Sequence, residues 1–271
     1  MSLLDVKQIS HTYKTNSMFK PHHERTVLNN ISFSIDEGSC FAILGSSGAG
    51  KSTIGKIILG IEKPTQGSVQ FMGHDLYTID KKLKHQLRRD LQVVFQDSYS
   101  SVNPRMTAEQ IIAEPLKNYE KLSATEQKRS IIELLEHVGL SKNDLMKYPH
   151  EFSGGQLQRI NIARALSLKP KLIVLDEPVS SLDMVNQTLI LELLNNLKKE
   201  LGLTYFFITH DIKAAHMLAD QLGILEKGQL VEVFNNPSEF FTSVHPVVHQ
   251  LRSAILAEHP SSRTIRSNKR P

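Results

Sequence analysis

The arrangement of hydrophobic and polar residues changes along the chain. In the N-terminal third, short runs such as LLDVKQIS, NNISFSI and GSVQFMG alternate apolar and polar residues, and Gly, Asn or Asp separates them. Such alternation places apolar side chains on one face of a strand, so these runs predict β-strands, some of them antiparallel. The N-terminal third is therefore expected to form sheet.

The middle of the chain, from about residue 107, shows the longer period of helices. The clearest case spans residues 123–139, where apolar residues recur at i, i+3, i+4 and i+7. Ser123 and Glu126 have the spacing of a capping box ahead of these positions, and Gly139 stands where the helix would end. This part is expected to be helical.

After Pro170, apolar runs alternate with helical stretches. The run at 172–175 ends in two acids, a helix is predicted at about 185–201, and another apolar run covers 205–209. Strands that alternate with helices favour a parallel sheet, and such sheets bind ligands beyond the carboxyl ends of their strands. We therefore expect an α/β core whose functional side chains follow its strands.

The composition favours a large globular domain. The chain has 271 residues, 40% of them hydrophobic, which is enough for a substantial core. Its apolar runs fall far short of the roughly 18 residues that a membrane-spanning helix needs, and the N-terminus lacks a signal-peptide pattern. The single cysteine, Cys40, can form no internal disulfide, which fits a reducing cytoplasm. We expect neither a membrane span nor export.

The net charge of +4 comes from basic residues at the C-terminal end of the chain. The last thirteen residues, HPSSRTIRSNKRP, contain four basic residues and no acid, and the remainder has 28 of each sign. We predict a basic, flexible tail at 252–271, with nucleic-acid or lipid binding by this tail as the less favoured alternative.

The stretch FAILGSSGAGKST carries the most specific chemical signal. It places glycine, lysine and serine in the pattern G-x-x-x-x-G-K-S directly after an apolar run. The glycines let backbone amides close around phosphate oxygens, the lysine reaches the β and γ phosphates, and the serine hydroxyl ligates magnesium. A plain Gly/Ser turn would not require lysine and serine at these places. The expected nucleotide-binding residues of this loop are Gly45, Ser46, Ser47, Gly48, Ala49, Gly50, Lys51, Ser52 and Thr53.

Further polar groups follow other apolar runs. LIVLDEP contains Asp176 and Glu177 after its apolar residues, and FFITHD contains His210. Asp176 suits a magnesium shell, Glu177 suits a group that polarises an attacking water, and His210 is a candidate γ-phosphate contact. Taken singly, an acidic turn and a hydrogen-bonded structural histidine are the alternatives. A phosphate loop in the same chain favours the functional interpretation.

The stretch EFSGGQLQRINIARAL has two adjacent glycines at an expected helix start. Ser153 and Gln156 have capping-box spacing, so this stretch could be a helix start alone. That leaves Gly154 and Gly155 unexplained, although each costs up to about 1 kcal/mol relative to alanine within a helix. Glycine there indicates that something approaches the backbone closely, and bare amides at a helix N-terminus bind anions. The stretch predicts a second phosphate-binding surface.

The combination of motifs in this chain resembles the ATP-binding cassette (ABC) ATPases, and the resemblance extends to about Leu251. The motifs that carry it are the phosphate loop, Gln96 after an apolar run, FSGGQ, LIVLDEP, SSLD and His210. The resemblance implies a P-loop NTPase (RecA-like) core, an antiparallel β subdomain and an inserted α-helical subdomain at about 97–152, within one domain at 1–251. In that family two such domains sandwich ATP, and the glycine turn of one caps the γ-phosphate held by the other. The second glycine turn would therefore serve a partner's nucleotide.

The resemblance also implies roles by position. Tyr13 would stack on adenine, with a core strand tyrosine as the alternative; Gln96 would sense magnesium and the attacking water, and Asp183 would belong to a loop that crosses the dimer interface. Two departures from the family pattern, Phe152 for leucine and Ser181 for alanine, remove no polar group. The residues implied for magnesium are Ser52, Gln96 and Asp176; those for hydrolysis are Glu177, His210, Gln96 and Lys51; those for the partner's nucleotide are Ser153, Gly154, Gly155 and Gln156.

A finer resemblance lies in FQDSYSSVNPRMTAEQIIAEPL and HPVVHQL, which look like the peptide and nickel importer branch, nearest to the second ATPase subunit of nickel-type importers. It implies MgATP hydrolysis at the cytoplasmic face of a cell membrane, powering uptake of nickel or a related metal chelate, with a di/oligopeptide importer as the alternative. The implied partners are a second ATPase subunit (a paralogue or a second copy), two transmembrane permease subunits and, through the complex, an extracytoplasmic solute-binding protein. A soluble cassette acting on nucleic acid or ribosomes is disfavoured, because the chain has one cassette, no inserted arm and a neutral body, and we expect no nucleic-acid partner.

Overall fold

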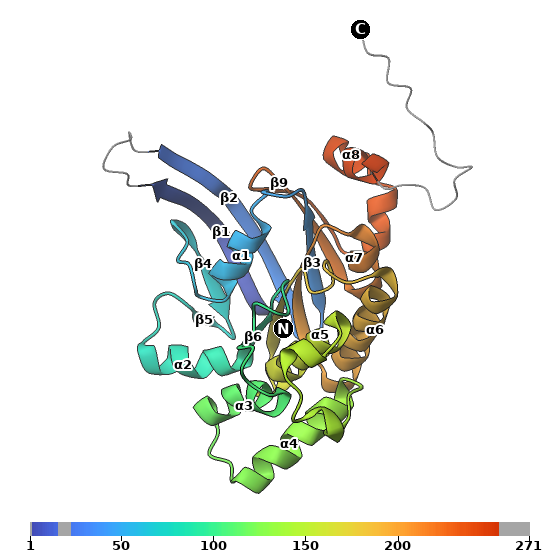
Figure 1. The fold of residues 1–271 in the computed structure, drawn as a ribbon. Helices are drawn as coiled ribbons and strands as arrows, with labels where there is room; N and C mark the ends of the chain where they lie inside the picture. The colour runs from blue at the N-terminus through green and yellow to red at the C-terminus, as the bar shows by residue number, and fades with distance from the viewer. Residues whose placement is uncertain (1, 16–22, 255–271) are drawn as a thin grey trace, which may run out of the picture.

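Two β-sheets organise the chain (Figure 1). The computed structural model describes residues 2–15 and 23–254. An antiparallel sheet has the order β2-β1-β4-β5. A larger sheet has the order β10-β9-β3-β8-β7-β6, in which every neighbouring pair is parallel except β10 and β9. The strands are β1 (Ser2–Thr15), β2 (His23–Asp36), β3 (Cys40–Gly45), β4 (Gln66–Phe71), β5 (His74–Asp75), β6 (Leu91–Val94), β7 (Leu172–Asp176), β8 (Thr204–Thr209), β9 (Gln221–Glu226) and β10 (Gln229–Phe234). The predicted parallel core and antiparallel N-terminal sheet are confirmed.

Successive residues of the central strands face two different cores. In β3, Cys40 and Ala42 pack in the core shared with the helices, whereas Phe41 and Ile43 pack in the core shared with the antiparallel sheet. Because side chains alternate across a strand and both faces are covered, every position of β3 is buried. The same arrangement explains the unbroken apolar runs in β7 and β8. Burial raises the pKa of the Cys40 thiol, as suits a structural rather than a reactive cysteine.

The helices agree with the periodicity of the sequence. Residues 123–139 contain α4, whose N-cap Ser123 and Glu126 form the predicted capping box. The segment 97–152 contains α3, α4 and two 3-10 helices but no strand, as expected for the helical subdomain; its boundaries as a separate unit stay a prediction. The helices are α1 (Lys51–Ile58), α2 (Lys81–Asp90), α3 (Ala108–Tyr119), α4 (Ala124–His137), η1 (Lys142–Asp144), η2 (Pro149–Glu151), α5 (Gly154–Leu166), α6 (Met184–Leu201), α7 (Ile212–Leu218), η3 (Pro237–Phe241) and α8 (Pro246–Ala254).

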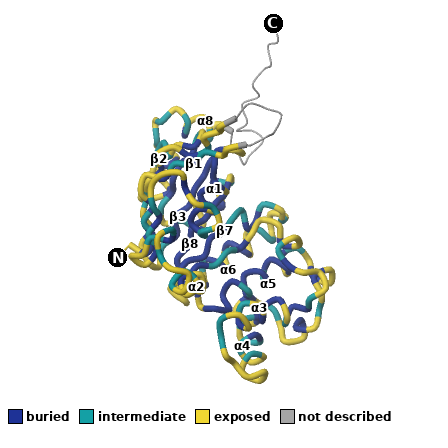
Figure 2. The backbone as a smooth tube through the Cα atoms, turned by 90° about the vertical axis from the view of Figure 1, so that its left-hand side faces the viewer, coloured by how far each residue is buried: buried dark blue, intermediate teal, exposed yellow. Residues whose placement is uncertain are grey.

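Helix α5, which begins at the double glycine, is the most enclosed helix of the lower part of the molecule in Figure 2, where its tube is largely dark blue. It contacts α3, α4, α6 and β6. Even its polar Gln158 and Asn161 are buried. A helix that is apolar on most sides belongs inside a protein, so the neighbours of α5 fix where the double glycine lies.

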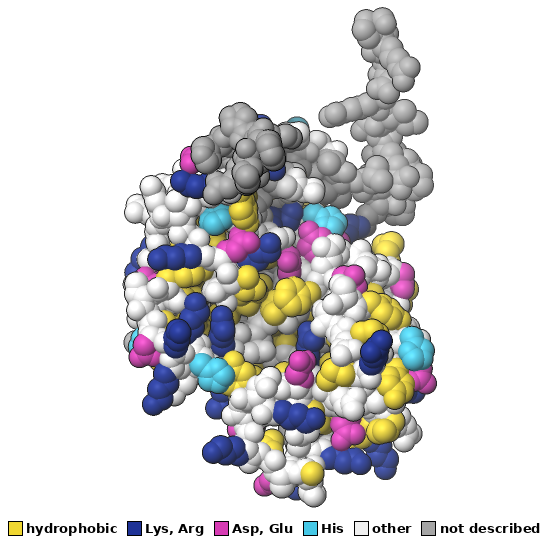
Figure 3. All heavy atoms as spheres, turned by 60° about the vertical axis from the view of Figure 1, so that its left-hand side comes forward, with side chains coloured by type: hydrophobic (Ala, Val, Ile, Leu, Met, Phe, Trp, Pro, Cys, Tyr) yellow, Lys and Arg dark blue, Asp and Glu magenta, His cyan; other side chains and the backbone are white. Residues whose placement is uncertain are grey.

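Helix α2 contains several basic residues, although the chain without its last thirteen residues has no net charge. Lys81, Lys82, Arg88 and Arg89 are all exposed on this short helix, and Arg89 pairs with Glu120. Figure 3, viewed from the side that carries α2 and the antiparallel sheet in Figure 1, shows Lys and Arg side chains gathered along one edge. The body is therefore neutral in sum but locally basic.

Helix α8 ends at Ala254, three residues into the segment predicted as the tail, and Val248 and Leu251 of this helix pack against the core. The domain boundary at 251 and the flexible tail at 252–271 stay predictions. Residues 255–271, which make up most of the predicted tail, lie outside the described residues. Within the parts that the structure describes, no helix combines the length and the apolar character that crossing a bilayer requires.

Candidate functional site

The phosphate-type loop connects β3 to α1, and its glycines are required for different structural reasons. A Cβ on Gly45 would lie 2.3 Å from the carbonyl oxygen of Leu225, and one on Gly50, whose φ is +109°, would lie 2.7 Å from Cδ2 of Leu28. Both positions therefore exclude larger residues through internal packing. Gly48 has φ +79° but nothing within 4 Å of its Cβ position, so the loop is open to an incoming group there.

The side chain of Lys51 lies inside this loop and is hydrogen-bonded to its main chain. Its Nζ donates hydrogen bonds to the carbonyl oxygens of Gly45 at 2.8 Å and Ser46 at 3.0 Å, and its side chain is only 6% exposed. Burial lowers the pKa of Lys51, and the carboxylates of Glu177 and Asp176 oppose that effect. An enclosed ammonium group whose hydrogen bonds go to main-chain carbonyl oxygens is suited to bind an anionic ligand as well. Of the neighbouring hydroxyl residues, Ser46, Ser47 and Ser52 are exposed, and Thr53 is buried.

The strand order brings the separate motifs to one edge of the larger sheet. Asp176 at the end of β7 is opposite Ile208 of β8, and Leu44 of β3 is opposite Thr209, the residue before His210. Because these strands are parallel and adjacent, the residues that follow them lie together. The sequence alone could not give this order, since β3, β8 and β7 are neighbours in space but not along the chain.

Glu177 turns the chain at this edge. Its φ of +47° lies in the left-handed region, which is uncommon for a residue with a side chain, and its amide donates to the carbonyl of Ile208 at 3.0 Å. Glu177 Oε2 lies 3.1 Å from His210 Nδ1, and Oε1 lies 4.0 Å from Lys51 Nζ. The side chain of Glu177 is 17% exposed, so the carboxylate is enclosed between a lysine and an imidazole. The structure thus brings Lys51, Asp176, Glu177 and His210 together, and their roles stay a prediction.

We expect Asp176→Asn to raise the melting temperature of the nucleotide-free protein. Burial and the nearby charge of Glu177 raise the pKa of Asp176, and Lys51 opposes this only in part. Ionised Asp176 therefore destabilises the folded state, and this contribution grows as the pH rises from the unfolded pKa, about 3.9, through the higher folded pKa. Neutral asparagine removes the effect. Thermal unfolding should show a gain at pH 7 that shrinks as the pH is lowered; an unchanged or lower melting temperature at pH 7 would contradict the expectation.

The glycine turn before α5 forms the predicted capping box. Ser153 Oγ accepts from the amide of Gln156 at 3.3 Å, and Gln156 Oε1 accepts from the amide of Ser153 at 3.0 Å. A Cβ on Gly155 would lie 2.7 Å from Oδ1 of Asn186, so the close approach expected at this glycine is made inside the chain. Gly154 is less restricted, and a Cβ there would meet only Leu182, at 3.3 Å.

Asp183 and Asn186 connect the turn to the start of α6. Asp183 Oδ1 accepts from the amides of Val185 and Asn186, and its Oδ2 accepts from Asn186 Nδ2 at 2.6 Å. These hydrogen bonds, first the one from the Asn186 amide, lower the pKa of Asp183. Asn186 is a neighbour of the glycine turn that the sequence analysis missed. An Asp-x-x-Asn spacing at a helix start was the only local signal.

Among the residues that the structure describes, no hydrogen bond or ion pair joins Lys51 to either Gln96 or Tyr13, the other residues expected at the nucleotide of this chain. Gln96 is exposed two residues after β6, and Tyr13 on β1 is partly exposed with its hydroxyl 3.4 Å from Thr53 Oγ1. In the described part of the chain, no hydrogen bond or ion pair joins residues 153–156 to residues 45–53. The described structure therefore shows no direct polar link between the glycine turn and the phosphate loop of the same chain.

A P-loop nucleotide-binding protein is defined by a strand, a glycine-rich loop that ends in Lys-Ser, and acids at the end of another strand of the same sheet, here β7, which β8 separates from β3. The family model described as ABC transporter matches residues 28–180. The chain is 40% identical over 264 residues to a putative oligopeptide transport ATP-binding protein, YkfD, of Bacillus subtilis (strain 168), covering 96% of this chain and 78% of that protein. It is 39% identical over 263 residues to the nickel import ATP-binding protein NikE of Escherichia coli O157:H7, covering 97% and 98%.

Two solved structures agree with this assignment. A dimeric ATP-binding cassette in a post-hydrolysis state, bound to ADP and Pi, matches with a TM-score of 0.75 and 31% identity, covering 85% of this chain and 97% of that one. The protein cbiO1 of Clostridium perfringens, part of the ABC transporter complex cbiONQ, matches with a TM-score of 0.76 and 30% identity, covering 89% and 91%. The chain therefore belongs to the ABC transporter family, as an ATP-binding ATPase subunit of the nickel and oligopeptide importer branch. ATPases of this family couple ATP hydrolysis to transport, and the RecA-like fold with its two subdomains is confirmed.

Proposed function

We propose that this chain binds MgATP at the Lys51 edge of the larger sheet and hydrolyses it to power the uptake of nickel or a related metal chelate. The observation that carries the ATPase part is the convergence of Lys51, Glu177 and His210 at adjoining strand ends. Similarity to nickel import proteins over nearly the whole chain supports the substrate.

The residues present fit ATP and magnesium. The loop of residues 45–53 has an open position at Gly48 and a buried ammonium group for the phosphates. Asp176 has a raised pKa because it is buried, and a nearby divalent cation would favour its charged form. Ser52, Gln96 and Asp176 would hold magnesium, which neutralises phosphate charge when bound.

Hydrolysis would proceed by attack of a water molecule on the γ-phosphorus, with the bond to the bridging oxygen of ADP breaking. Glu177 would orient and polarise the water, since its carboxylate is held by His210 and Lys51 rather than free in solvent. Lys51 and His210 would stabilise the charge that develops on the phosphoryl oxygens, and Gln96 would respond to the water and the metal.

The glycine turn would act on the nucleotide of a second ATPase subunit. Ser153 and Gln156 are exposed, and Asp183 is hydrogen-bonded to Asn186, which lies against Gly155 of the same turn. In the described residues, none of the three makes a hydrogen bond or ion pair with the phosphate loop of its own chain. The dimeric cassette among the solved relatives supports such an arrangement. The partner would be a paralogous ATPase or a second copy of this chain.

The segment 97–105 after Gln96 is the proposed contact for the two permease subunits, at the cytoplasmic face of the membrane. The carbonyl of Ser98 accepts from Asn161 at 3.1 Å, and the carbonyl of Ser101 accepts from Arg164 at 2.7 Å. Both donors lie on α5, the helix that begins with the glycine turn. A permease that moves this segment would therefore also move the turn. A solute-binding protein would act through the permease, and no nucleic-acid partner is proposed.

A di- or oligopeptide importer is the second candidate, because the similarity to YkfD is as high as that to NikE. Accumulation of nickel and of labelled short peptides should be compared between cells that contain the chain and cells that lack it. We expect nickel accumulation to fall in cells that lack it and to be restored by the wild-type chain but not by Lys51→Ala. Loss of peptide uptake alone would assign the chain to peptides, and unchanged uptake of both would refute the proposed substrates.

A further inference from the structure

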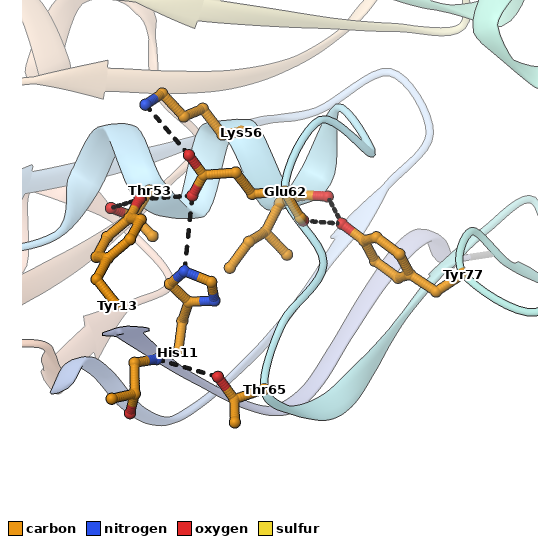
Figure 4. Close-up of polar contacts among 9 residues, drawn as sticks. His11, Tyr13, Thr53, Lys56, Glu62, Thr65 and Tyr77 are labelled. Atoms are coloured by element: carbon orange, nitrogen blue, oxygen red, sulfur yellow. Dashed lines mark hydrogen bonds and ion pairs between the residues drawn. The ribbon is translucent and has the colours of Figure 1, made fainter. Parts of the chain in front are cut away.

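A polar cluster surrounds Tyr13, and its His11, Lys56 and Glu62 belong to none of the nucleotide-binding motifs (Figure 4). We call it the Glu62 cluster: it consists of His11 and Tyr13 from β1, Thr53 and Lys56 from α1, and Glu62 from the loop after α1. The three segments come together because the antiparallel sheet packs against α1 in one core. In Figure 4 the carboxylate of Glu62 lies between the Lys56, Tyr13 and His11 side chains.

Glu62 ties the tyrosine hydroxyl to the helix of the phosphate loop. The Tyr13 hydroxyl donates to Glu62 Oε2 and also lies 3.4 Å from Thr53 Oγ1. The other carboxylate oxygen, Oε1, accepts from Lys56 Nζ at 3.4 Å. The Tyr77 hydroxyl donates to the main-chain carbonyl of Glu62 at 2.6 Å and so holds the loop itself. The far end of the Tyr13 ring is therefore fixed relative to α1.

His11 restrains the same ring from its side. The rings of His11 and Tyr13 meet edge to face, with centroids 4.6 Å apart and an angle of 83°. His11 is only 9% exposed, neither of its ring nitrogens has a hydrogen-bond partner, and Nε2 lies 3.7 Å from Glu62 Oε2. Tyr13 nevertheless remains 36% exposed, so part of its ring stays open to a ligand while the rest is packed.

The protonation states of Tyr13 and Glu62 suit a stable hydrogen bond, with Tyr13 as the donor and Glu62 as the acceptor. Burial, reinforced by the hydrogen bond to Glu62, raises the pKa of Tyr13, so the phenol keeps its proton. Burial alone would raise the pKa of Glu62, but the hydrogen bond from Tyr13 and the charge of Lys56 outweigh it and lower the pKa. Glu62 is therefore a carboxylate that accepts a charge-assisted hydrogen bond near neutral pH.

We propose that Glu62 is a positioning residue for the nucleotide base: through the Tyr13 hydroxyl it holds the open part of the ring at a fixed place beside the phosphate loop. This inference rests on the proposed function, in which Tyr13 stacks on adenine. A ring held in place loses less rotational freedom when a base stacks on it, so affinity for the base is higher. Glu62 should then affect ligands that carry a base and leave ligands made only of phosphates unaffected.

The test compares binding of ATP and of inorganic tripolyphosphate, both with magnesium, by the full-length chain. Tyr13→Ala removes the ring and should weaken ATP binding about tenfold, within the range of base–aromatic stacking. Glu62→Ala and Tyr13→Phe each remove the hydroxyl–carboxylate contact and should each weaken ATP binding about threefold to fivefold, with no further loss when combined. Glu62→Gln keeps an acceptor for the hydroxyl and should bind ATP nearly as the wild type does. Tripolyphosphate binding should be the same in all five variants.

The outcomes separate this inference from the proposed function. An equal loss of ATP and tripolyphosphate binding in Glu62→Ala would mean that Glu62 supports α1 and not the base, and so would overturn the inference. Normal ATP binding by both Glu62→Ala and Tyr13→Phe, together with weakened binding by Tyr13→Ala, would also overturn it while keeping Tyr13 as the base contact. Normal ATP binding by Tyr13→Ala would remove Tyr13 from the proposed site altogether. If Glu62→Ala does not fold, Tyr13→Phe decides, because it leaves Glu62 in place.

Discussion

Glu177→Gln should reduce ATP hydrolysis by about 10²- to 10⁴-fold, the usual contribution of a positioned general base, while ATP binding stays close to that of the wild type. The amide has the shape of the carboxylate and can keep a contact with His210, now 3.1 Å from Oε2, but it cannot take up a proton from the attacking water. Because binding survives and hydrolysis stalls, the closed, ATP-bound state should accumulate. Phosphate release by the assembled transporter and nucleotide binding by the isolated chain measure the two effects.

Glu37→Gln is the matched control for this substitution. Glu37 is half exposed and pairs with Lys171, away from the phosphate loop, so loss of its charge should leave hydrolysis unchanged. Turnover by Glu177→Gln equal to that of Glu37→Gln would remove Glu177 from the proposed role. Loss of ATP binding by Glu177→Gln, with a normal melting temperature, would instead mean that Glu177 contributes to binding ATP before hydrolysis.

Gly154→Asp should abolish hydrolysis at the site that we propose the glycine turn completes on a partner, without weakening ATP binding by the isolated mutant chain. Two like charges about 4 Å apart repel by about 4 kcal/mol at an effective dielectric constant of 20, so an aspartate beside a γ-phosphate would oppose closure strongly. The chain itself should accept the side chain, because a Cβ on Gly154 meets only Leu182, at 3.3 Å. Gly155 would be a poorer test, since any side chain there meets Asn186.

Gly154→Asn separates charge from size in this experiment. It has the same shape as Gly154→Asp but no charge, so closure should be impaired much less. Hydrolysis should be measured in the two-ATPase complex with each phosphate loop blocked in turn, and ATP binding in the isolated chain. If the isolated Gly154→Asp chain folds normally but no longer binds ATP, the turn serves its own nucleotide, and the proposed arrangement of two subunits is wrong.

The sequence determined the parts of this protein that short-range chemistry controls. The strand, glycine-rich loop and helix around Lys51 are contiguous, so their residue types and spacing were sufficient to predict a phosphate site. The capping box of Ser153 and Gln156 was predictable for the same reason, because its two hydrogen bonds span three residues. The family resemblance added the expected roles of separated residues, such as Tyr13 and Asp183.

Only the tertiary structure decided which distant residues meet. Strand order places His210 against Glu177, and the packing of the antiparallel sheet on α1 places Glu62 against Tyr13. The close neighbour of Gly155 is Asn186, on another helix, where the sequence had suggested only an external ligand. Periodicity and capping act over a few residues, whereas these contacts depend on how whole sheets and helices pack, and no local pattern in the chain encodes their partners.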